Sequence, residues 1–265
     1  MGSRPHDRAA RKGPTAPRQP ADTVLFIFAK APIPGQVKTR LCPPLTPDEA
    51  ATLHGSIVLD MLERSRGAAG IDRVVACAPS ADHVFFKILE ERHGVGLLAQ
   101  TGDDLGARMA HAIGEAFARK YRRVLVIGTD LPTVPGSVFG EARALLDNHD
   151  LVLGPAHDGG YYLIGLRKPA PELFAGIPWS TDRVFQLTRQ KASALGLSVA
   201  LLPIRRDIDT VEDLAAVIED TDVAGKAKMG EMALSPRTAG VLRLLARRLG
   251  VPPAGEAPGS TTAAR

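Results

Sequence analysis

The stretch from Arg123 to Pro132, RVLVIGTDLP, constrains the fold of this chain more than any other. Its four consecutive apolar residues, 124–127, are typical of a strand that is buried on both faces of a parallel sheet. The strand ends near Gly128, and Asp130 follows before a Leu-Pro pair that disfavours extension. The sequence therefore predicts a central strand with a carboxylate just beyond its carboxyl end. Ligands bind at this edge of open α/β sheets, although a turn-forming or helix-capping Asp is the simpler interpretation.

Apolar strands and amphipathic helices alternate along the rest of the chain. Thr46 and Glu49 form a capping box around Pro47, and Ser180 or Thr181 is expected to cap a helix that ends near residue 195. Strands are predicted at 23–29, 73–78, 95–99, 123–128, 151–154, 161–166 and 198–202, and helices at about 47–66, 81–93, 105–120, 136–148, 182–195, 211–220 and 237–250. This alternation predicts an α/β fold, a three-layer α/β/α sandwich with a mostly parallel sheet.

The predicted pI of 9.2 depends on the two ends of the chain. Residues 1–22 carry a net charge of +3 and residues 237–265 carry +4, so with a total of +4 the body between them is mildly acidic. Aromatic residues make up 5% of the chain, and no basic patch is interleaved with aromatic rings, which argues against nucleic acid as the main partner.

The same composition predicts how the chain divides into domains. We expect a disordered basic tail at 1–22, one catalytic domain at 23–220, a linker and C-terminal helix at 221–250, and a disordered end at 251–265. The apolar face of the C-terminal helix must be buried against another surface, and a second subunit in a homodimer is one candidate.

The chain has no apolar run near the ~20 residues of a membrane span, and its first residues lack the apolar core of a secretion signal. We therefore expect a cytoplasmic protein without a membrane partner. Cys42 and Cys77 form neither a disulfide framework nor a zinc set, and each is expected to be a small buried residue.

Charged side chains gather in the loops that follow the predicted strands. Lys30, Lys38 and Arg40 surround a Pro/Gly turn after the first strand, and Asp207 and Asp209 precede the helix that begins at residue 211. If the sheet is parallel, these loops meet the acid of the central strand at one edge. Lys and Arg bind phosphate oxygens and Asp binds Mg²⁺, so the set is typical of a polyphosphate site with a divalent cation. A solvated basic turn and a pair of acids that merely favour a helix dipole are the alternatives.

Six segments together carry a resemblance to a known family: AKAPIPGQVKTRL, QTGDDLGARM, GTDLP, GPAHDGGYYLIGL, PWST and DIDTVEDL. In this order, over about residues 24–218, they resemble the family A (GT-A) glycosyltransferase branch of the nucleotide-diphospho-sugar transferases. They are more loosely similar to the phospholactate guanylyltransferases, which share a Lys-x-Arg-Leu step, an Asp-Leu-Pro and a late Asp-x-Asp-Thr. The resemblance implies a GT-A-like fold with a nucleotide or nucleotide-sugar and a small-molecule acceptor as its partners.

The resemblance also implies roles for individual residues. Asp130 would be catalytic and would hold Mg²⁺ or Mn²⁺ together with Asp209. The implied substrate-binding residues are Lys30, Lys38 and Arg40 on phosphates, Gln100, Asp104 and Arg108 at the base or sugar, and Gly159 and Gly160 in the last loop. This chain departs from the family pattern because it has Gly128-Thr129-Asp130 in place of a full Asp-x-Asp and lacks a glycine-rich first loop.

Asp158, in GPAHDGGYY, is a second candidate catalytic residue. As a general base it would deprotonate an acceptor hydroxyl, which an inverting glycosyl transfer requires. It could instead bind metal or acceptor, or only shape the turn before the two glycines.

Three functions from different classes remain open at this point. The leading interpretation is a metal-dependent glycosyltransferase that moves a sugar from a nucleotide-sugar to a small acceptor. The alternative is a nucleotidyltransferase that joins a nucleoside triphosphate to a phosphorylated small acid, and a basic first loop suits its triphosphate. The third, a non-catalytic nucleotide-binding module, would tolerate loss of the acids that this chain retains.

Overall fold

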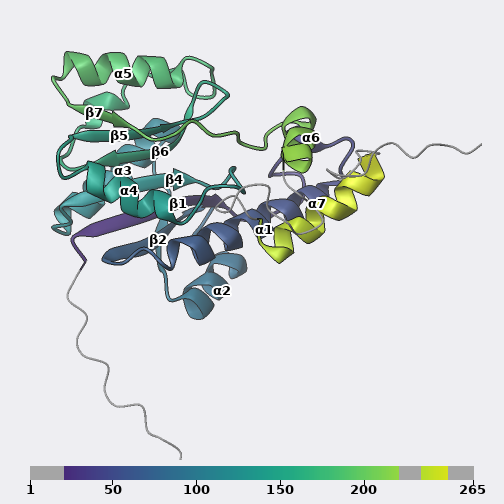
Figure 1. Cartoon of the computed structure of the whole chain (residues 1–265). Helices are drawn as coiled ribbons and strands as arrows, with labels where there is room; N and C mark the ends of the chain where they lie inside the picture. Colours follow the sequence, from purple (N-terminus) through teal and green to yellow (C-terminus); the bar gives the residue numbers. More distant parts are fainter. Residues whose placement is uncertain (1–20, 221–233, 250–265) are drawn as a thin grey trace, which may run out of the picture.

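The computed structural model describes residues 21–220 and 234–249, and its centre is a seven-stranded sheet in the order β3-β2-β1-β4-β6-β5-β7 (Figure 1). The strands are β1 (Thr23–Lys30), β2 (Ile71–Ala78), β3 (Gly96–Ala99), β4 (Arg123–Gly128), β5 (Leu151–Pro155), β6 (Tyr161–Leu166) and β7 (Val199–Leu201). The helices are α1 (Pro47–Ser65), α2 (Val84–His93), α3 (Leu105–Ala118), α4 (Ser137–Leu145), α5 (Val184–Ala194), α6 (Val211–Asp220) and α7 (Pro236–Leu249), with short 3₁₀ helices η1 (Thr39–Leu41) and η2 (Pro171–Leu173). The predicted α/β class and mostly parallel sheet are confirmed, with β4 in the middle.

The direction of β6 determines which loops share an edge of the sheet. β1 is parallel to β2 and β4, whereas β6 is antiparallel to both of its neighbours, β4 and β5. Leu163 of β6 pairs with Ile127 of β4, so β6 begins at the edge where β4 ends. The loop before β6 therefore lies at the same edge as the loops after β1, β2, β4 and β7.

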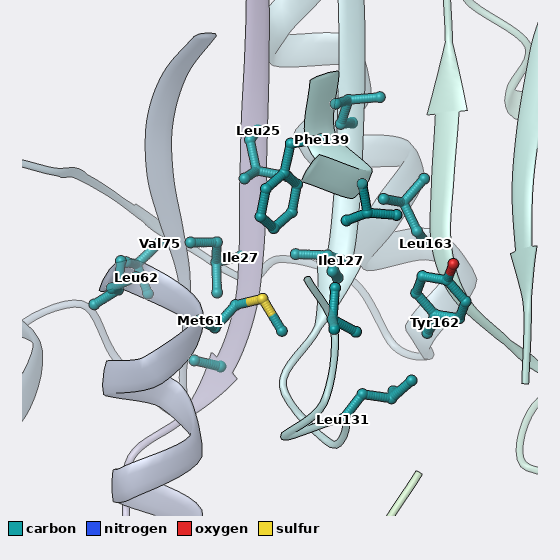
Figure 2. Close-up of a cluster of buried hydrophobic side chains, with 14 of the residues drawn as sticks. Leu25, Ile27, Met61, Leu62, Val75, Ile127, Leu131, Phe139, Tyr162 and Leu163 are labelled. Carbon is teal, nitrogen blue, oxygen red and sulfur yellow. The ribbon is translucent and has the colours of Figure 1, made fainter. Parts of the chain in front are cut away.

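Two apolar layers enclose the sheet. On one face, strand residues such as Leu25, Ile27 and Ile127 pack against α1, α2 and α4, and Figure 2 shows Met61 and Phe139 among them. On the other face the strands pack against α3, α5 and η2. Residues of β1 and β4 alternate between the two layers because successive side chains of a strand point to opposite faces. This explains why both strands are continuously apolar.

Local signals predicted some helix ends correctly and one incorrectly. The capping box of α1 is present, because Thr46 Oγ1 accepts from the N–H of Glu49 and the Glu49 carboxylate accepts from the N–H of Thr46. For α5 the prediction was wrong: the helix begins at residue 184, with no side-chain cap. Ser180 has a φ of 65°, and the Thr181 hydroxyl donates to the carbonyl of Pro178, so the segment before α5 forms a turn.

A third apolar cluster joins α6 and α7 to α1, away from the sheet (Figure 1). Leu242, Leu245 and Ala246 of α7 are buried there, and Arg237 pairs with Asp60 of α1. The apolar face of α7 therefore packs within its own chain, and a homodimer stays a prediction.

The described residues begin just before β1 and include Asp22. Asp22, which the sequence assigned to the tail, pairs with Arg123, and its carbonyl accepts from the N–H of Arg122 and of Arg123. Residues 1–20, 221–233 and 250–265, which hold most of the predicted tail, linker and end, lie outside the described residues. Among the described helices, none has the length and hydropathy of a membrane span.

Candidate functional site at the carboxyl edge of the sheet

The basic loop after β1 delivers one buried and two exposed cations to this edge. Lys30 and Arg40 are exposed, whereas the Lys38 side chain is only 2% exposed. Lys38 also has a φ of 50° and a ψ of 35°, a left-handed conformation that is uncommon for a residue with a Cβ. The backbone here is thus held in a sparsely populated state that turns the lysine inward.

Lys38 binds acids and a carbonyl from two other loops. Its ammonium donates to the carboxylate of Asp130 and to the carbonyl of Ile208, and it lies 3.8 Å from Asp209 Oδ1. Arg40 Nη1 lies 3.0 Å from the other oxygen of Asp209, Oδ2. The N–H of Ile208 donates to the Asp130 carbonyl at 2.9 Å, which fixes the two acid loops to each other. The structure therefore brings Asp130 and Asp209 together, as predicted, with Lys38 between them.

The charges at this edge shift the pKa values of two aspartates in opposite directions. Loss of hydration opposes ionisation of Asp130, but the Lys38 ammonium outweighs it and holds the Asp130 pKa below its usual value. At Asp207, burial, followed by the negative charges of Asp158, Asp213 and Asp209, raises the pKa to about 6. A cation bound beside Asp207 would relieve this excess of negative charge.

The donor set fits a divalent cation. The carboxylates of Asp130 and Asp209 are 50% and 43% exposed, and both face one point at the strand edge. Mg²⁺ prefers one or two carboxylates with substrate phosphates and water as its other ligands. Within residues 21–220 and 234–249 no three acidic, His or Cys side chains form a ready-made cage, so these two acids would need ligands from the substrate.

The predicted base or sugar residues lie after β3, and all three have hydrogen-bond partners within the chain. The Asp104 carboxylate caps α3 by accepting from the N–H of Ala107 at 2.7 Å, and Arg108 Nε donates to the Gly102 carbonyl at 3.0 Å. Gln100 Nε2 donates to the Ala76 carbonyl at 2.8 Å. A carbonyl partner requires the amide nitrogen at that position, so the amide oxygen of Gln100 is directed away from it.

The loop before β6 is shaped by its glycines. Asp158 Oδ1 accepts from the N–H of Gly160 at 2.8 Å, which is the turn that the sequence left as an alternative. Gly159 has a φ of 84°, and a Cβ there would lie 2.1 Å from the carbonyl oxygen of Asp182. Asp158 is exposed, and its charge acts on Asp207, so it belongs to the same region as the acids.

Two residues near the site were missed or underused by the sequence argument. Asp207 was expected among the acids of the polyphosphate site but was given no role of its own, although it belongs to the same Asp-x-Asp as Asp209. His54 of α1 gave no signal, because a histidine on a buried helix face is typical of a core. It is buried, and its Nε2 lies 3.0 Å from the Lys30 carbonyl, so it supports the end of β1 beneath the basic loop. Burial lowers the His54 pKa, which favours the neutral imidazole.

Comparison with known proteins agrees with this fold. Residues 61–181 match a family described as "Uncharacterized protein conserved in bacteria (DUF2064)". A solved structure from Desulfovibrio desulfuricans G20, provisionally named a nucleotide-diphospho-sugar transferase, is 35% identical with a TM-score of 0.76, and the match covers 86% of this chain and 96% of that one.

Curated relatives carry more specific names. The 3-phospho-D-glycerate guanylyltransferase of Phenylobacterium zucineum is 30% identical over 195 residues, which are 68% of this chain and 83% of the relative. The 2-phospho-L-lactate guanylyltransferase of Methanothermobacter thermautotrophicus is 28% identical over 187 residues, 68% of this chain and 78% of the relative.

The sheet topology and this likeness place the chain in the fold class of the nucleotide-diphospho-sugar transferases. Within it, the chain belongs to the family that contains the Desulfovibrio desulfuricans protein and the Phenylobacterium zucineum guanylyltransferase. The expected resemblance is confirmed for the fold, and the curated relatives are guanylyltransferases, which the sequence resembled more loosely than the GT-A glycosyltransferases.

Proposed function

We propose that this protein is a nucleotidyltransferase that joins a nucleoside triphosphate, guanosine triphosphate first among candidates, to a phosphorylated small acid. The observation that carries the proposal is that curated relatives over two thirds of the chain are guanylyltransferases named for phosphorylated acids. The basic loop supports it, because a triphosphate brings more negative charge than a nucleotide-sugar for Lys30 and Arg40 to meet. The proposal therefore reverses the order of the two leading sequence-based interpretations.

The reaction would be a displacement at phosphorus. A phosphate oxygen of the acid attacks the α-phosphorus of the triphosphate, and a new bond forms between them. The bond from the α-phosphorus to the oxygen that bridges to the β-phosphate breaks, and pyrophosphate leaves with the electron pair. The residues of this chain would contribute position and charge: Lys30 and Arg40 on the phosphates, and the acid loops on the opposite side.

Asp130 and Asp209 would hold a divalent cation, Mg²⁺ or Mn²⁺, with Asp207 beside them. When bound, the cation would neutralise the charge on the leaving pyrophosphate. Asp130 is ionised in the resting protein, because the Lys38 ammonium holds its pKa below the usual value despite the loss of hydration. Gln100 would accept a hydrogen bond from the base through its free amide oxygen, which suits an N–H on the base edge.

Glycosyl transfer is the second candidate, favoured by the 35% identity to the Desulfovibrio desulfuricans protein and by the exposed Asp158. The two reactions make different demands on Asp158. A phosphate acceptor is already ionised at neutral pH, since its second pKa is about 6, and it needs no base. A hydroxyl acceptor does need one, and removing a general base typically costs about 10²- to 10⁴-fold in rate. Asp158→Asn should therefore retain turnover within about tenfold if the proposal is correct.

The direct test measures both binding and products. Full-length protein with Mg²⁺ is offered each nucleoside triphosphate with 3-phosphoglycerate, phospholactate or phosphoenolpyruvate, and pyrophosphate release is measured. A parallel thermal-shift series uses triphosphates, diphosphates and nucleotide-sugars. We expect triphosphates to stabilise the protein and at least one acid to release pyrophosphate. Stabilisation by nucleotide-sugars alone, with no pyrophosphate from any pair, would overturn the proposal, and binding without turnover would favour the non-catalytic module.

A further inference from the structure

The Lys38 ammonium lies where a metal ion would be expected. Its three oxygen neighbours come from Asp130, Asp209 and the carbonyl of Ile208, which lie on two separate loops. Carboxylate and carbonyl oxygens are the ligands that Mg²⁺ and Mn²⁺ take from proteins. In this arrangement the positive charge that compensates the two acids is a lysine of the same chain.

The loop that carries Lys38 holds it there by strain and burial. Its left-handed backbone is sparsely populated for a lysine, and its side chain is almost fully buried. A lysine that only bound phosphate would be expected to reach solvent, as Lys30 and Arg40 do. The acids, by contrast, are each about half exposed, so another cation can approach them from the solvent side.

We propose that Lys38 is a tethered stand-in for the divalent cation: it occupies the point between Asp130 and Asp209 in the resting protein and leaves it when nucleotide and metal bind. The displaced ammonium then pairs with the phosphates that arrive with the metal. This second half rests on the proposed function, whereas the first half concerns only the metal-free and nucleotide-free protein. Metal alone must compete with Lys38 for the acids, so metal and nucleotide favour each other's binding.

The test is a Mn²⁺ titration of the full chain without nucleotide, followed by calorimetry or by the electron paramagnetic resonance signal of free Mn²⁺. Lys38→Met keeps the length of the apolar stem and removes the charge. We expect it to bind Mn²⁺ more tightly than the wild type by a factor on the order of ten or more, because the competing charge is gone. Wild-type affinity for Mn²⁺ should rise in the presence of a nucleoside triphosphate, and Lys38→Met should show less of this rise.

Arg40→Met is the matched control. It removes a cation that contacts the same Asp209, but Arg40 is 68% exposed and its charge is screened by solvent. Its Mn²⁺ affinity without nucleotide should change by about twofold at most. An equal gain in both variants would mean that any nearby positive charge weakens metal binding, and the special position of Lys38 would be refuted.

A second variant keeps the test decisive if Lys38→Met folds poorly. In Lys38→Met with Asp130→Asn, both partners of the central ion pair are neutral, so the fold should recover and the gain in Mn²⁺ affinity should vanish. Unchanged Mn²⁺ affinity in a folded Lys38→Met protein would overturn the inference. If Lys38→Met gains Mn²⁺ affinity but no triphosphate binds either protein, the stand-in role survives and the proposed function fails.

Discussion

Replacing Asp130 by Asn should destabilise the protein as well as abolish turnover. The substitution leaves the Lys38 ammonium buried with the Ile208 carbonyl and with Asp209 at 3.8 Å. A charge-assisted hydrogen bond contributes about 1.5 to 3 kcal/mol, and we take about 2 kcal/mol because the Asp130 carboxylate is half exposed to solvent. For a domain of this size that corresponds to a fall in Tm of roughly 4 to 8 °C.

The assay is urea and thermal unfolding in chelator, without nucleotide, at pH 7. Lys38→Met in the Asp130→Asn background removes the orphaned charge, so the double variant should be more stable than Asp130→Asn alone. The free energies of unfolding of the wild type, the two single variants and the double variant then give the coupling energy between the two side chains. The folded-state pKa of Asp130 lies below its usual 3.8, so its contribution is complete above that pH and is lost as the pH falls through the lower folded value. The difference in the free energy of unfolding between the wild type and Asp130→Asn should therefore become smaller at acid pH. An Asp130→Asn protein within about 0.5 kcal/mol of the wild type at pH 7 would refute the ion pair.

Two further substitutions test other parts of the site. Asp207→Asn should stabilise the metal-free protein at pH 7 by about 3 kcal/mol, because the raised pKa of about 6 makes ionisation of Asp207 costly in the folded state, and the gain should disappear below pH ~4; an unchanged pH profile of unfolding would contradict this. Gly106→Ala places a Cβ 2.5 Å from the ring of Trp179, the single tryptophan, so its fluorescence should shift to the red, whereas Gly114→Ala in the same helix meets no atom within 4 Å and should leave the emission unchanged.

The features that could be predicted from the sequence depend on residues that are close together in the chain. The apolar run of β4 and the acid after it gave the central strand and Asp130, since periodicity and strand-breaking residues are local signals. The capping box at Thr46 is a local signal as well, and it is present. The α5 cap failed because a local preference of Ser180 and Thr181 yielded to a turn that packs against the loop of Gly159.

Contacts between segments that are far apart in the chain could not be predicted from the sequence. The reversal of β6 depends on which strand it pairs with, and nothing in YYLIGL encodes a direction. The burial of Lys38 depends on a backbone carbonyl 170 residues away. Every residue has such a carbonyl, so the residue types in the sequence do not indicate which one binds the lysine. A pattern of Lys and Arg predicts cations near phosphates, but only the folded loops show which cation is turned inward.

The backbone hydrogen bond from Ile208 to Asp130 explains how loops that are far apart in the sequence come together at one edge of the sheet. It ties the loop after β7 to the loop after β4, although the two strands are separated by β6 and β5 in the sheet. The Ile208 side chain is fully buried in the cluster formed with α1, α6 and α7, and so is Leu41 from the basic loop. The same cluster thus anchors the acid loop and the basic loop on one support outside the sheet. Asp209 directly follows Ile208 and Arg40 directly precedes Leu41, so α6 and α7 help to set the spacing between these two charged side chains. In the proposed reaction, a triphosphate with its cation would have to fit that spacing.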